Sequence, residues 1–278
     1  MEINLGQERI VQLRATYSAA EVQELAARKR VDAFGQVAKL FQRPKAEDIA
    51  ILGAQLRFEP FWFAAASARY TYDRRHAYRV PVAPEVRAVT VYGSQHPVTQ
   101  ERNATFELPA VEHCVEELHL ELILDAVSGQ EGPFAAYLGY PQIELPEIAA
   151  LEKEGAVAVL PEVRGSFVVR KLVSLLMRTF QADQIHEERI DVAEVTLFFR
   201  PVYDVELLWQ GKDKKQVLEF DALTGESRAA PGETKKRIAR VLDNDALFDI
   251  GADTVGAVLP GANIAIKLGR LAARKAIQ

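Results

Sequence analysis

Residues 199–226 read FRPVYDVELLWQGKDKKQVLEFDALTGE and predict a β-hairpin. From Tyr203 to Trp209 apolar residues alternate with Asp and Glu, which is the pattern of a strand with one apolar and one solvated face. Residues 211–215 supply a polar turn, and the return arm ends in Asp-Ala-Leu-Thr-Gly-Glu. Asp and Thr side chains can bond to nearby backbone in such a turn, and Gly225 can adopt a positive φ.

Two parts of this hairpin recur earlier in the chain. The pattern Asp-Ala-apolar-Ser/Thr-Gly occurs at 125–129 and again at 221–225. The pattern Phe-x-Pro-apolar-aromatic occurs at 58–62 and again at 199–203, at the start of an alternating strand each time. Two interpretations are open at this point. Either a strand–turn–strand unit has been duplicated, or two common turn motifs occur independently.

A helix predicted over 166–182 precedes the hairpin that closes on Asp-Ala-Leu-Thr-Gly-Glu. This arrangement resembles the PepSY type of module over about residues 166–226. The resemblance implies a helix-plus-hairpin shape and a role in modulating proteases or binding partners rather than in catalysis. Members of that family are usually exported, whereas this sequence shows no export signal.

Composition predicts a globular protein of a reducing compartment. The chain has 278 residues, 49% apolar and 26% charged, enough for one large domain or two ordinary ones. A net charge of −5 argues against nucleic-acid binding by the whole surface, and the single Cys114 excludes an internal disulfide. The sequence has no run of 18 apolar residues, so it predicts no transmembrane helix. It has no phosphate-binding glycine loop, so it predicts no cofactor. We therefore expect a cytoplasmic protein without a cofactor.

The predicted fold is α+β, with two β-rich antiparallel units and flanking N- and C-terminal helices. The predicted divisions are an N-terminal helical segment (1–44), a β-rich domain (45–135), a helix-plus-hairpin domain (136–230) and a C-terminal helical tail (231–278). Ser18 and Glu21 form a capping-box pattern that predicts a helix to about residue 41, while residues 1–17 fit either a short helix or an extended arm. The small and aromatic residues that alternate over 62–72 predict a strand face that a helix covers closely.

One cluster has the residue types of a metal site: His113, Cys114, Glu117 and His119. On a strand, however, His113, Glu117 and His119 share one face and Cys114 points the other way. The alternative is a polar sheet face beside one buried thiol.

Aromatic and cationic residues alternate over 69–79, which is typical of surfaces that stack bases and bind phosphates. The candidate contacts there are Arg69, Tyr72, Arg74, Arg75 and Arg79. The alternative is a hairpin whose arginines discourage edge-to-edge pairing.

The C-terminal stretch combines apolar and basic residues, which fits packing on its own domain or on a neighbouring subunit, or peripheral contact with an anionic membrane. The candidate contacts are Lys267, Arg270, Leu271, Arg274 and Lys275. Taken together, these patterns predict a non-catalytic binding protein, a subunit or regulator in a protein assembly, with a protein partner or self-association. The alternatives are a metal-dependent enzyme or sensor at the His113 cluster, and an accessory protein that contacts nucleic acid or a membrane surface.

Overall fold

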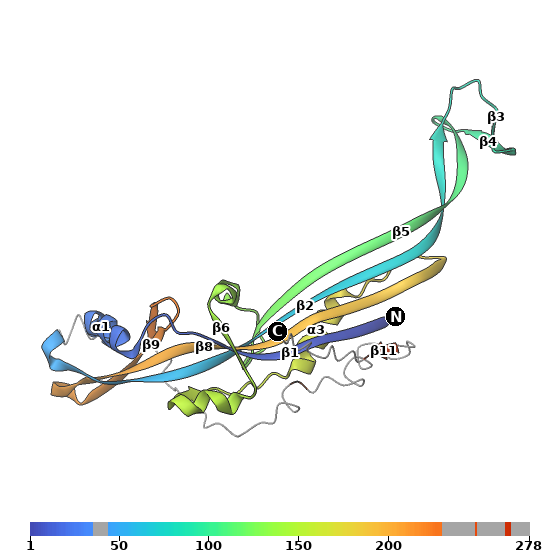
Figure 1. Cartoon of the computed structure of the whole chain (residues 1–278). Coiled ribbons are helices and arrows are strands. Elements are labelled where there is room, and N and C mark those ends of the chain that lie inside the picture. Colours follow the sequence, from blue (N-terminus) through green and yellow to red (C-terminus); the bar gives the residue numbers. More distant parts are fainter. Residues whose placement is uncertain (36–43, 230–247, 249–264, 268–278) are drawn as a thin grey trace.

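Three long strands dominate the computed structural model, which describes residues 1–35, 44–229, 248 and 265–267. They are β2 (Ile49–Pro81), β5 (Ala104–Asp125) and β8 (Gln184–Trp209). β2 lies between the other two and pairs antiparallel with both (Figure 1). Their side chains alternate between the two faces of the sheet along most of their length.

Shorter strands complete one mixed sheet. β1 (Glu2–Leu13) runs parallel to β8, and β6 (Gln142–Leu145) and β11 (Ala265–Lys267) pair with β1. β9 (Lys214–Asp221) and β10 (Ser227–Ala229) extend the sheet beyond β8. β4 (Ser94–Gln100) and β3 (Ala88–Val91) lie at the far end of β5, and β7 (Val157–Ala158) pairs with β2.

Two α-helices occur in the described residues, α1 (Ala19–Lys29) and α3 (Gly165–Leu176). The capping box before α1 is confirmed, because the Glu21 backbone N–H donates to Ser18 Oγ at 3.4 Å and Ser18 N donates to the Glu21 carboxylate. The helix ends at Lys29, well before residue 41. Short 3-10 turns are η1 (Asp32–Phe34), η2 (Ala46–Asp48), η3 (Phe134–Gly139), η4 (Ile148–Glu154) and η5 (Gln210–Lys212).

One face of β2 and β5, which we call the helix-covered face, packs under α3. Its β2 residues are Trp62, Ala64, Ala66, Ala68, Tyr70 and Tyr72, all buried. Trp62 Nε1 donates to the Val163 carbonyl at 2.7 Å, and the Tyr70 hydroxyl donates to the Leu176 carbonyl at 3.0 Å. The predicted helical cover is therefore confirmed. The small alanines leave room for the backbone of α3 to approach the sheet, and the tyrosine and tryptophan polar atoms find partners when buried. The opposite, open face carries residues such as Arg69 and Glu117.

The two recurring turns have the same hydrogen bonds. Asp125 and Asp221 each accept backbone N–H bonds through Oδ1 from the residues two and three positions later. Each following glycine, Gly129 and Gly225, donates its N–H to the carbonyl of that Asp at 2.8 Å and has φ near +70°. The Ala126 N–H donates to the Pro60 carbonyl, and the Ala222 N–H donates to the Pro201 carbonyl.

The surroundings of the two turns match as well. The Ala126 carbonyl accepts N–H bonds from residues 162 and 163 just before α3, and the Ala222 carbonyl accepts them from residues 16 and 17 just before α1. β1 runs parallel to β8 beside Phe199, as β7 runs parallel to β2 beside Phe58. Sequence matches alone left two interpretations open. These hydrogen bonds favour duplication of a unit that contains a strand, a helix, two further strands and the closing turn.

The two copies are related by a pseudo-twofold axis. Phe58 pairs with Pro201 and Pro60 pairs with Phe199, so exchange of the copies returns the same pairing. The axis passes beside the pair Glu59–Arg200. Both helices pack across the junction of the two copies: α3 contacts β2, β5 and β8, and α1 contacts β2 and β8, beside residues such as Tyr203.

The predicted α+β fold of two antiparallel units with flanking helices is wrong. β2 and β8 were assigned to separate units, but they pair from Ile49–Trp209 to Asp73–Gln184 and make one mixed sheet. Of the two alternatives for residues 1–17, the extended one is confirmed, because residues 2–13 form strand β1. The predicted C-terminal helix lies outside the described residues, apart from residue 248 and β11. Alternation reveals that a strand has two faces, but it does not reveal which strand lies beside it.

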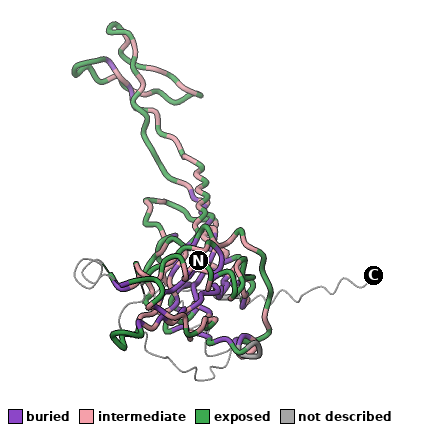
Figure 2. The backbone as a smooth tube through the Cα atoms, turned by 90° about the vertical axis from the view of Figure 1, so that its left-hand side faces the viewer, coloured by how far each residue is buried: buried purple, intermediate pink, exposed green. Residues whose placement is uncertain are grey.

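The hairpins of the two copies differ greatly in length. In the second copy the strand ends at Trp209, shortly after Pro201, whereas in the first it continues from Pro60 to Pro81. β8 begins at Gln184, opposite Asp73. Beyond this point residues 74–112 continue as two paired strands with β3 and β4 at the tip. We call residues 74–112 the β-ribbon. Figures 1 and 2 show it projecting from the body, with mostly exposed and intermediate residues.

Candidate functional site

The structure does not bring the predicted metal cluster together. His113, Glu117 and His119 are exposed along the open face of β5, and Cys114 is half-buried on the other face. His113 and His119 are six residues apart on an extended strand, which separates them by roughly 20 Å. Within the described residues, no group of three or more His, Cys, Asp or Glu side chains is placed to hold a metal ion.

The arginines proposed for nucleic-acid contact face glutamates on β5. Arg69 Nη1 lies 2.6 Å from Glu117 Oε1, Arg74 Nη2 lies 2.5 Å from Glu112 Oε2, and Arg79 lies 3.7 Å from Glu107. Tyr72 donates its hydroxyl to Glu116 at 2.7 Å, and this bond is the largest cause that raises the pKa of Tyr72 to about 12. Each pair places a negative charge beside a cation, so the stripe offers a phosphate backbone little net positive charge.

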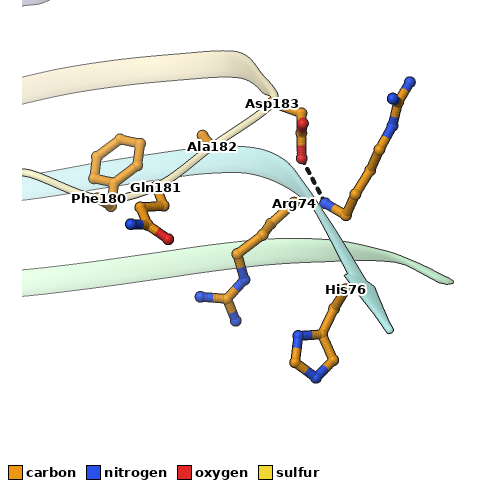
Figure 3. Close-up of a pocket in the computed structure, with 7 residues that line it drawn as sticks. Arg74, His76, Phe180, Gln181, Ala182 and Asp183 are labelled. Carbon is orange, nitrogen blue, oxygen red and sulfur yellow. Dashed lines mark hydrogen bonds between the residues drawn. The ribbon is translucent and has the colours of Figure 1, made fainter. Parts of the chain in front are cut away.

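Arg75, the remaining arginine of that set, lies at the base of the β-ribbon. Its backbone N–H donates to Asp183 Oδ2 at 2.6 Å, the bond drawn as a dashed line in Figure 3. The surrounding hollow has a volume of about 600 Å³ and is lined by Arg74, Arg75, His76, Phe180, Gln181, Ala182 and Asp183. The Asp183 side chain covers the edge of β2 at the point where β8 begins.

Asp73 joins three strands at this same level. Its carboxylate oxygens lie 2.7 Å from His113 Nδ1 on β5 and 2.9 Å from His186 Nε2 on β8. Hydrogen bonds from His186 and His113 are the largest causes that lower the pKa of Asp73. The contact ties the base of the β-ribbon to the body.

The C-terminal candidates are only partly described. Lys267 belongs to β11, whose backbone pairs with β1 opposite Asn4. Arg270, Leu271, Arg274 and Lys275 lie outside the described residues. No helix in the described part of the chain combines the length and apolar character needed to cross a bilayer.

A charged network on the open face, beside the pseudo-twofold axis, was not predicted. We call it the axial network; its members are Arg57, Glu59, Tyr137, Arg200, Asp204, Glu219, Asp221 and Arg228. Arg200 is 9% exposed and Glu219 is 3% exposed. The residues come from β2, β8, β9, β10 and η3, so the network fixes these elements in one register.

Arg200 lies at the centre of the axial network. Its guanidinium donates to Glu59, to Asp221 at 3.1 Å and to the Tyr137 hydroxyl at 3.0 Å. Its carbon Cζ also lies over the Tyr137 ring, 5.4 Å from the centroid. Burial and a 2.5 Å hydrogen bond to Asp221 raise the pKa of Tyr137 to about 12. The Tyr137 hydroxyl therefore donates to Asp221 and accepts from Arg200.

Acidic groups outnumber cations in the axial network, with four carboxylates and three guanidiniums. Arg57 contacts Asp204 at 3.2 Å and Glu219 at 3.0 Å. Burial is the largest cause that raises the pKa of Asp204 to about 6, and Arg57 opposes that shift. Each described carboxylate of the network lies beside a guanidinium, so the contacts link β2, β8, β9 and β10 to one another.

The sequence carried one signal for this network. Arg57 and Glu59 alternate with buried Phe58, a pattern that by itself indicates a solvated face. They are only partly exposed because η3 lies on that face and because β9 brings Glu219 and Asp221 beside them. Such neighbours depend on sheet order, which the alternation does not encode.

Comparison of the chain with protein-family models, with curated proteins and with solved structures found no match.

Proposed function

We propose that this chain is a non-catalytic binding protein, a subunit or regulator of a cytoplasmic protein assembly, and that the β-ribbon contacts its partner. The length difference between the two copies supports this most directly. The second copy closes its hairpin at Trp209 and Lys214 and still makes the same turn and strand pairings. The fold therefore does not need the extra length of residues 74–112.

The physical chemistry of the β-ribbon also supports a binding role. A two-stranded ribbon in water has little apolar surface to bury and is only marginally stable by itself. Here cross-strand pairs such as Arg74–Glu112 and a hydrogen bond from Tyr78 to Glu112 at 2.5 Å hold it together. Val111, at 52% exposure, and Tyr78, at 44%, remain accessible along it. A partner would bury these side chains and stabilise the ribbon.

The test removes residues 77–109, the outer part of the β-ribbon, without altering the body. Residues 77–109 are replaced by Asn-Gly, which links the paired residues His76 and Ala110 through a two-residue hairpin turn. Full-length and shortened proteins are then used to recover partners from the source cell. We expect the shortened protein to keep its near-UV circular dichroism and to lose the specific partner. Equal recovery by a folded shortened protein would refute the proposal.

A further inference from the structure

The outer edge of β5 is the longest unpaired strand edge in the described part of the chain. β4 pairs with β5 only over residues 104–106, and the Asp125 turn returns only to a single bridge between Leu124 and Glu131. Between them residues 107–123 pair with β2 on one side and, among the described residues, with no strand on the other. At about 3.3 Å per residue this edge is roughly 50 Å long.

Two hydrogen bonds give the direction of the free backbone groups. The Asp125 N–H points away from β2 and donates to the Gln130 carbonyl at 2.8 Å, whereas the Ala126 N–H donates to Pro60 of β2. Since backbone groups alternate sides along a strand, odd-numbered residues from 111 to 123 direct N–H and C=O outward. Pro109 falls in the same outward set, so its missing N–H does not disturb the pairing with β2.

The side chains along this edge select a chemical class of partner. β5 carries five glutamates and Asp125 but neither lysine nor arginine. Glu121 is exposed, and Val115, at 58% exposure, lies on the same open face. On the helix-covered face Leu118 and Leu120 are only partly buried, because no further strand lies beside them in the described chain. Glu107, Glu112 and Glu117 pair with arginines of β2, whereas Glu121 has no ion pair among the described residues. An added strand that alternates apolar and basic residues would cover the leucines and place a cation beside Glu121.

The second copy contains an internal precedent for such pairing. There β10 adds antiparallel to the outer edge of β9, the strand equivalent to β5. It places Arg228 Nε 2.5 Å from Glu219 Oε2. The first copy has only the Leu124–Glu131 bridge at the equivalent place.

We infer that the outer edge of β5, residues 107–123, binds an extended segment of a partner protein in which apolar and basic residues alternate. The segment adds as a further strand, with main-chain hydrogen bonds to the odd-numbered residues. A second copy of this chain fits the edge less well, since β5 supplies no lysine or arginine to lie beside Glu121. This inference rests on the proposed binding function and names its surface.

The experiment uses a labelled peptide in which lysine and valine alternate. Fluorescence anisotropy measures its binding to the full-length protein. The control peptide has the same composition with its lysines in one block. Val115→Pro removes one outward N–H, as Pro109 does naturally, and Val115→Thr keeps it. We expect the alternating peptide to bind more tightly than the block peptide, and Val115→Pro to weaken it about tenfold. Val115→Thr should stay within about twofold of wild type.

A second variant tests the charge requirement independently of the backbone. Glu117→Lys combined with Glu121→Lys should weaken binding of the alternating peptide and reduce its sensitivity to salt. Equal affinity for both peptides, or unchanged binding by a folded Val115→Pro protein, would overturn the inference. A wild-type dimer that Val115→Pro converts to a monomer would also overturn it, because the occupant would then be a second copy.

The two proposals fail in different ways. If replacement of residues 77–109 abolishes partner recovery while Val115→Pro changes neither recovery nor peptide binding, the binding function stands and the edge inference is wrong. If Val115→Pro abolishes both but the shortened protein still recovers its partner, the edge inference stands and the role of the β-ribbon is wrong.

Discussion

Replacement of Arg200 by methionine should destabilise the protein by about 3 kcal/mol, because it leaves two partly buried carboxylates without their shared cation. Arg200 donates to Glu59, Asp221 and Tyr137, and its side chain is 11% exposed. Removing one partner of a buried pair costs about 3–5 kcal/mol. The lower end applies here because Glu59 keeps Arg57 at 3.1 Å and both carboxylates retain some solvent contact.

Urea unfolding at pH 7, followed by tryptophan fluorescence, measures this change. The matched control is Arg69→Met, which breaks ion pairs of Arg69 with Glu117 and Glu187 whose side chains are 33–55% exposed. Exposed pairs contribute about 0.5 kcal/mol, so the control should unfold close to wild type. A loss below about 1 kcal/mol for Arg200→Met, or one no larger than that of the control, would refute a stabilising role for the axial network.

Three further substitutions test individual elements. Asp204 has a folded pKa of about 6, above its ordinary value, so its contribution to stability is present below about pH 4 and is lost as pH rises to 6. Asp204→Asn should remove that loss, which is about 1 kcal/mol after allowance for solvent screening. A plot of the unfolding free energy against pH should then be flatter than for wild type, and an unchanged slope would contradict this. Gly225→Ala should cost about 1–2 kcal/mol in urea unfolding because φ is +74° and the new methyl would meet a tyrosine ring, whereas Gly211→Ala, in open space, should cost less. Tyr70→Phe removes a buried hydrogen bond and should lower the unfolding free energy by about 1 kcal/mol, against a smaller loss for Tyr78→Phe on the ribbon; equal losses would count against the burial argument.

Local features of the fold were predictable from the sequence because they depend on neighbouring residues. The hairpin of β8 and β9, the capping box at Ser18 and the covered face around Trp62 each follow from alternation or turn chemistry within a short stretch. The recurring turns pointed to duplication without deciding it.

The arrangement of the two copies was not predictable in the same way. Phe58 and Pro201 are paired across the pseudo-twofold axis although they are far apart in sequence. Each helix contacts strands of both copies, which a division of the chain into successive units does not anticipate. The axial network went unrecognised for the same reason, because Arg200 finds Glu59 only through that pairing.

The length of β5 beyond its neighbours was equally hidden. Residues 104–125 show an ordinary alternation, and only the positions where β4 ends and the Asp125 turn begins define which part of the edge is open. The metal and nucleic-acid hypotheses arose from residue types on that strand pair. The structure spreads the first set along β5 and pairs the arginines of the second set with glutamates, apart from Arg75.

Amide hydrogen exchange of the free protein, resolved by residue, tests the open edge of β5 most directly. The outward N–H groups of Val111, Val115 and the other odd-numbered residues to 123 should exchange rapidly, while the even-numbered amides between them, bonded to β2, should be protected. Equal protection of odd and even amides in the free monomer would mean that another strand already covers this edge, and the account of its function would then be wrong.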